Sequence, residues 1–90
     1  MITGKTESGF AFSVEEDAFD DMRVVDALAG ISDGTNPLAV SFLTERILGK
    51  EQREELYQHV AEKDGSVPIE KVGNEITQIF AAYGGPGKNS

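Results

Sequence analysis

The chain has 90 residues, of which 16 are acidic and 8 basic, giving a formal charge of −8. A chain of this length supports one modest core and leaves little room for a large active site. The acidic balance argues against nucleic acid and anionic membranes as direct partners, and the lack of cysteine excludes disulfides and thiolate metal ligands.

Residues 1–14 predict a β-hairpin, because apolar and polar residues alternate with a period of two on both sides of position 8. Between the two runs, the segment 7–9 is typical of a three-residue turn that ends in a glycine with positive φ. We expect Phe10, Phe12 and Val14 to face the core together. An isolated hairpin is marginal in water, so this one must lie on helices.

Four helices are predicted after the hairpin. Asp17 is expected to cap the first helix and Gly30 to end it, whereas Asn36-Pro37 is a strong start signal for the second. Gly49 separates the second helix from the third. The fourth carries the clearest amphipathic stripe. The predicted helices are 17–30, 37–48, 51–63 and 68–83.

These elements predict an α+β, mainly α fold, an N-terminal β-hairpin followed by four helices packed in one small domain. The domain is expected to cover residues 1–84, with 85–90 as a flexible C-terminal tail rich in glycine. No segment approaches the ~20 apolar residues of a membrane span, and the first residues do not form a signal peptide. We therefore expect a cytoplasmic protein without a membrane partner.

The sequence does not predict an enzyme, and it indicates no catalytic residue, cofactor or metal site. The single histidine, His59, lies on a polar helix, which favours a surface role, with a protonation switch as the alternative. The acidic residues between Glu15 and Asp26 lack the glycine of a calcium loop, so helix capping and a solvated face account for them. A pair of carboxylates with one raised pKa is the remaining enzymatic interpretation.

Apolar residues are abundant for a chain of this size. The span 38–43 is apolar on nearly every side. Together with the stripe from Ile69 to Tyr83, it can present more apolar surface than one chain of this size is able to bury. Such a surplus indicates a surface for a partner or for self-association, with burial in the core as the competing interpretation. The candidate partner-binding residues are Phe42, Leu43, Ile47, Ile79, Phe80 and Tyr83.

The order of features along the whole chain carries a resemblance to a known family. The segments concerned are the opening hairpin 2–10, the acidic stretch 17–21, the helix from Pro37-Leu38 to Leu48-Gly49, the turn Asp64-Gly65-Ser66-Val67-Pro68 and the end Lys88-Asn89-Ser90. In this order they resemble the small tail assembly chaperones of long-tailed, siphovirus-type phages and prophages of Gram-positive bacteria.

The resemblance implies a role without catalysis. A protein of this family binds the tape measure protein, keeps it soluble and helps recruit tail tube subunits in the cytoplasm of the bacterial host, and it is not retained in the finished tail. Many relatives are also made as a longer frameshifted product. The expected partners are the tape measure protein, the tail tube protein and, in a homo-oligomer, further copies of the chain.

A second hypothesis is an acidic interaction module or inhibitor that imitates the charge of nucleic acid. Seven of the 16 acidic residues lie between Glu7 and Asp26, where only Arg23 opposes them. Residues 1–26, which also include Lys5, therefore carry a charge of −5. Ionic strength separates the hypotheses, because charge mimicry weakens steeply with salt whereas apolar binding persists.

Overall fold

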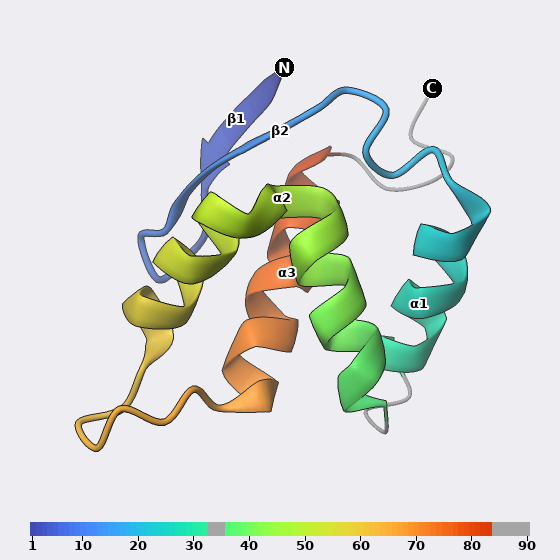
Figure 1. Cartoon of the computed structure of the whole chain (residues 1–90). Coiled ribbons are helices and arrows are strands. Elements are labelled where there is room, and N and C mark those ends of the chain that lie inside the picture. The colour runs from blue at the N-terminus through green and yellow to red at the C-terminus, as the bar shows by residue number, and fades with distance from the viewer. Residues whose placement is uncertain (33–35, 84–90) are drawn as a thin grey trace.

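The computed structural model describes residues 1–32 and 36–83, and within these ranges it contains a two-stranded hairpin and three helices (Figure 1). The expected mainly helical domain with an N-terminal antiparallel hairpin is confirmed. The predicted tail 85–90 lies outside the described residues. The elements are β1 (Ile2–Lys5), β2 (Ala11–Val14), α1 (Met22–Ser32), α2 (Pro37–Val60) and α3 (Ile69–Tyr83).

The expectation of four helices is wrong, because the segments predicted at 37–48 and 51–63 belong to one element, α2. Gly49 still interrupts the helix, since its φ of 80° and ψ of 169° are not helical. It is the only residue of α2 that departs in this way, so the helix resumes at once in a new direction (Figure 1). The second part of α2 ends at Val60.

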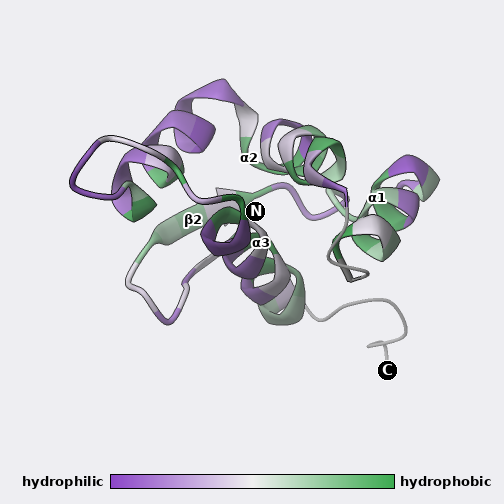
Figure 2. Ribbon diagram, turned by 90° about the horizontal axis from the view of Figure 1, so that it is seen from below, coloured by the Kyte–Doolittle hydropathy of each residue, from purple (hydrophilic) through white to green (hydrophobic). Residues whose placement is uncertain are grey.

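The bend gives the two parts of α2 different neighbours. The first part lies between α1 on one side and α3 on the other, and the second part runs toward the hairpin (Figure 1). Leu43 before the bend and Leu56 after it are both completely buried. Most residues of the second part are hydrophilic (Figure 2). One helix therefore contributes to the core on both sides of its bend.

The hairpin has the predicted turn, and its strands pair in an antiparallel register. Ile2 lies opposite Val14, and Lys5 lies opposite Ala11. Gly9 has a φ of 95°, and its N–H donates to the carbonyl oxygen of Thr6 at 2.9 Å. The side chains expected to face the core, those of Phe10, Phe12 and Val14, are at most 5% exposed.

The free edge of β2 is covered by a side chain of α2. The side-chain amide of Gln52 donates to the carbonyl oxygen of Ser13 at 2.7 Å, and its oxygen accepts the N–H of the same residue at 2.8 Å. These two bonds satisfy the backbone groups that an edge strand otherwise leaves open. The second part of α2 is thereby joined directly to the hairpin.

Helix α1 begins at Met22 and not at Asp17, the expected cap. Residues 16–19 form a turn that buries Phe19 against Phe80 and Tyr83, with ring centroids 5.0 and 4.8 Å away. The helix starts only after this turn, where the carboxylate of Asp21 accepts the N–H of Arg23 at 2.8 Å.

Helix α1 also continues past Gly30, where it was expected to end, as far as Ser32. A Cβ atom at position 30 would lie 3.3 Å from the Cβ of Ala39, so this glycine allows α1 to approach α2 closely. The residue therefore serves helix packing and not termination.

Helix α3 follows the predicted turn at Asp64-Gly65, where the carboxylate of Asp64 accepts both the N–H and the hydroxyl of Ser66. Its apolar stripe is buried at Val72, Ile76 and Ile79. Among the described residues, none of the helices has the length and apolar character needed to cross a membrane.

Replacing Gly49 by alanine is expected to lower the free energy of unfolding by about 1–3 kcal/mol, because its φ and ψ lie in a region that is almost restricted to glycine. The same substitution at Gly73 in α3 is the matched control. A Cβ there meets ordinary contact distances of 3.9 and 4.0 Å, and alanine should raise stability by about 0.5–1 kcal/mol. Urea unfolding of both variants measures this contrast, and equal effects would contradict the assigned role of the bend.

Acid should weaken the start of α1. The hydrogen bond from Arg46 at 2.7 Å and that from the N–H of Arg23 hold the pKa of Asp21 below its ordinary value of 3.8. A carboxyl group whose pKa is lower in the folded than in the unfolded state stabilises the fold at any pH above its unfolded-state pKa. This stabilisation is lost as the pH falls through the pKa of the folded state.

We therefore expect Asp21→Asn to lose less stability than the wild type between about pH 6 and about pH 3. Asp26→Asn, which removes the same charge from the middle of α1, is the control. Urea midpoints at both pH values provide the measurement, and an unchanged pH dependence in Asp21→Asn would exclude this contribution.

Candidate functional site

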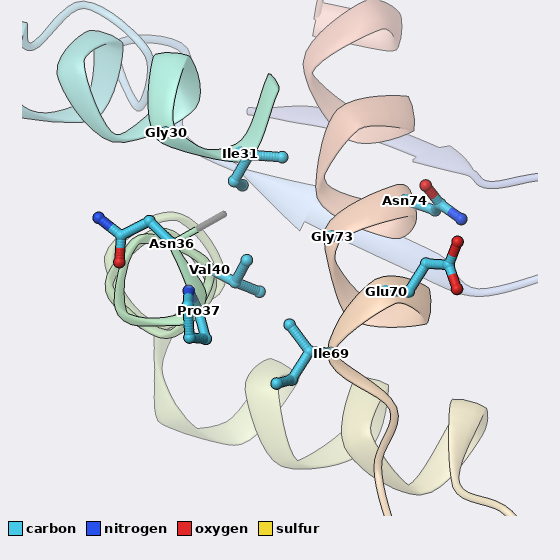
Figure 3. Close-up of a pocket in the computed structure, with 9 residues that line it drawn as sticks. All are labelled: Gly30, Ile31, Asn36, Pro37, Val40, Ile69, Glu70, Gly73 and Asn74. Carbon is cyan, nitrogen blue, oxygen red and sulfur yellow. The ribbon is translucent and has the colours of Figure 1, made fainter. Parts of the chain in front are cut away.

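An apolar groove lies where the end of α1 meets the starts of α2 and α3 (Figure 3). We call it the interhelical groove. Its volume of about 530 Å³ is within the range of roughly 300–1,000 Å³ found for ligand pockets. It is lined by Gly30, Ile31, Asn36, Pro37, Val40, Ile69, Glu70, Gly73 and Asn74.

Local sequence rules position the walls of the groove. Asn36 caps α2, accepting the N–H groups of Leu38 at 3.1 Å and Ala39 at 3.3 Å, and Pro37 occupies the first helical position. On the opposite wall, Gly73 has no side chain to fill the space between α3 and α2. The groove therefore lies between the capped start of α2 and Gly73 in α3.

The groove has an apolar interior and a polar rim. The side chains of Ile31, Val40 and Ile69 point toward a common space, whereas those of Glu70 and Asn74 point outward at the rim (Figure 3). Ile69 is 58% exposed although it is apolar and β-branched. Such a side chain at the edge of an apolar groove is a typical contact point for another molecule.

The six residues predicted to bind a partner occupy different environments. Leu43 and Ile79 are completely buried and Ile47 is 6% exposed, so all three belong to the core of this chain. Phe42 is exposed and lines a shallow hollow between α1 and α2. Contact with a partner through the first three would require the core to open, and a partner can reach Phe42 directly.

The remaining two candidates, Phe80 and Tyr83, are partly buried and pack against Phe19. The hydroxyl of Tyr83 also donates to the carbonyl oxygen of Glu16 at 2.8 Å. Much of the apolar surface expected to be in surplus on the last helix is therefore covered by the turn before α1. The six residues do not form one continuous surface.

The sequence did contain a signal for the groove. Gly73 interrupts the apolar pattern of a helix without ending it, and an isolated helical glycine often has a packing or binding reason. Ile69 was recognised as part of the stripe, but its exposure depends on how α2 and α3 diverge at their starts. Neither residue was singled out as a contact residue from the sequence.

A polar cluster, separate from the interhelical groove, joins the hairpin turn to α2 and α3. The hydroxyl of Ser8 donates to Oε2 of Glu75 at 2.7 Å, and Nε2 of His59 lies 3.0 Å from the same hydroxyl and 3.1 Å from the carbonyl oxygen of Ser8. Glu75 is only 4% exposed, and its Oε1 has no hydrogen-bond partner within the described structure. A carboxylate within an apolar stripe was the sequence signal for this cluster.

The proton arrangement of this cluster does not favour nucleophilic catalysis. In a Ser-His-acid triad the histidine takes the proton of the serine, and the acid contacts the histidine. Here the hydroxyl of Ser8 donates its hydrogen bond to the acid, Glu75. The carbonyl oxygen of Ser8 can only accept, so Nε2 of His59 donates to it. The cluster therefore holds the turn in place.

Groups of three or more His, Asp or Glu side chains suited to a metal ion do not occur in residues 1–32 and 36–83. The chain matches no protein-family model, and no curated protein or solved structure shows significant similarity to it. The interhelical groove is the better candidate for a binding site, because the polar cluster directs its hydrogen bonds to groups of its own chain.

Ser8→Ala should lower the free energy of unfolding by about 1–3 kcal/mol, because it removes the hydrogen bond to the buried carboxylate of Glu75. In a Glu75→Leu background the same change should cost less than about 0.5 kcal/mol, since leucine needs no partner. Ser41→Ala, at an exposed position of α2, is the control for the loss of a hydroxyl. Urea unfolding of the wild type, the two single variants at positions 8 and 75 and their double variant completes the cycle, and additive effects would show that the two side chains are not coupled.

Proposed function

We propose that this chain is a phage tail assembly chaperone that acts by binding and not by catalysis. It binds the tape measure protein, keeps it soluble in the cytoplasm of the bacterial host and helps recruit tail tube subunits, and it leaves before the tail is finished. The order of sequence features supports the family, and the apolar groove in an acidic chain is the structural observation that supports the binding role.

The groove has the physical properties that a solubilising partner needs. Apolar area removed from water contributes roughly 25 cal/mol per Å², so the exposed part of Ile69 and the apolar interior beside it supply affinity without a specific polar contact. The charge of −8 keeps the free chain and its complexes apart by repulsion. Both properties suit a protein that coats an aggregation-prone partner in many copies.

The alternative function is an inhibitor that imitates nucleic-acid charge. It is favoured by the side chains of Glu15, Glu16, Asp17 and Asp20, which are all exposed around one turn. Glu16 contacts the N-terminal ammonium group at 3.3 Å, which reduces the free charge of this turn. Binding that persists above about 0.5 M salt, where screening is strong, would favour the chaperone over this alternative.

Co-expression with the tape measure protein of the same prophage tests the proposal. The wild-type chain should raise the soluble fraction of the tape measure protein several-fold, and Ile69→Ser should remove most of this gain. Met22→Ser is the matched control, because Met22 is 68% exposed but lies at the other end of α1 and does not line the groove.

Circular dichroism of both variants establishes that they remain folded. No gain in soluble tape measure protein with the wild-type chain would overturn the proposed function. An equal loss in both variants would place the contact outside the groove.

A further inference from the structure

The composition of the interhelical groove favours a protein helix over a small polar ligand. Its polar lining groups do not converge, because Glu70 and Asn74 point away from the apolar interior (Figure 3). The side-chain oxygen of Asn36 already accepts two backbone N–H groups of α2. Small-molecule sites usually present several convergent polar groups, whereas helix-binding grooves are mainly apolar.

The floor of the groove has room for side chains from such a helix. A Cβ at Gly73 would lie 3.9 Å from Val40 and 4.0 Å from Ile31, so the missing side chain leaves space beside these two residues. A buried glycine on one wall and an exposed isoleucine at the edge match the alternation of gap and ridge that helix packing uses.

The charges around the groove indicate the sign of the partner. Among the described residues that line the groove, Glu70 is the only one with a charged side chain. At the rim, Glu70 is exposed and makes no ion pair with any described residue. A second copy of the chain would bring another charge of −8, so a basic partner is the complementary one.

We infer that the groove binds an amphipathic helix that carries lysine or arginine beside its apolar face, and that this cation meets the carboxylate of Glu70. The apolar face enters between α2 and α3 and covers Ile69. The inference rests on the proposed function, in which the helix belongs to the tape measure protein, and it adds which surface binds and what charge the bound segment has.

Two designed helical peptides with the same leucine face test this inference, one with flanking lysines and the other with flanking glutamates. They are titrated into the 15N-labelled full-length chain. The lysine peptide should shift the amide signals of Ile31, Val40 and Gly73, and the glutamate peptide should bind at least about 5-fold more weakly.

Charge reversal separates a local ion pair from the effect of net charge. Glu70→Lys should weaken binding of the lysine peptide about 2- to 5-fold more than Glu54→Lys, which changes the net charge equally at an exposed position in the second part of α2. Glu70→Gln, which only removes the charge, should give an intermediate effect and guards against destabilisation of α3 by a lysine in its first turn.

Equal weakening by Glu70→Lys and Glu54→Lys would overturn the inference, because net charge alone would then explain the preference. Signal shifts confined to residues outside the groove would also overturn it. If co-expression rescues the tape measure protein while the peptide experiment fails, the proposed function stands and the groove assignment falls. If the peptide binds as expected and co-expression fails, the preference of the groove for basic helices stands without the phage role.

Discussion

The bend of α2 at Gly49 is the constraint on which the rest of the structure depends. A straight helix of 24 residues would extend about 36 Å and would carry its second half away from the hairpin. With the bend, Leu43 is buried in the part of α2 that lies between α1 and α3, and Leu56 is buried in the part that follows Gly49. Gln52, one turn after the bend, then reaches the edge of β2 and satisfies both backbone groups of Ser13.

The burial achieved by this arrangement decides which apolar residues remain for a partner. The turn before α1 places Phe19 over Phe80 and Tyr83, and these aromatic side chains cover one another. At the opposite end of the bundle no comparable turn among the described residues covers Ile69, which therefore stays exposed beside the groove. The proposed binding site is thus a consequence of where the helices begin and end.

Helix α3 connects the groove with the polar cluster. Asn74 lines the groove on one side and the hollow around Ser8, His59 and Glu75 on the other. The cluster holds the hairpin turn against α2 and α3, so the position of α3 depends on hydrogen bonds made more than 60 residues away in the sequence. In the proposed function, this connection keeps the wall of the groove in place before a partner helix arrives.

Local rules in the sequence were sufficient for several elements. The turn at Gly9, the helix start at Asn36-Pro37, the interruption at Gly49 and the stripe of the last helix all depend on residues within about four positions of one another. The same rules misplaced the start of α1, because Asp17 is a good cap in isolation but the burial of neighbouring Phe19 requires a turn there.

The sequence by itself determined the hairpin, the start of α2 at Asn36-Pro37, the interruption of α2 at Gly49 and the surplus of acidic charge, since each follows from neighbouring residues or from composition. Only the tertiary structure decided that Leu43, Ile47 and Ile79 belong to the core, that Ile69 borders a groove and that Glu75 is buried beneath Ser8. The physical reason is that burial depends on how whole helices cross, which involves residues far apart in the chain, whereas turns and caps depend on hydrogen bonds within a few residues.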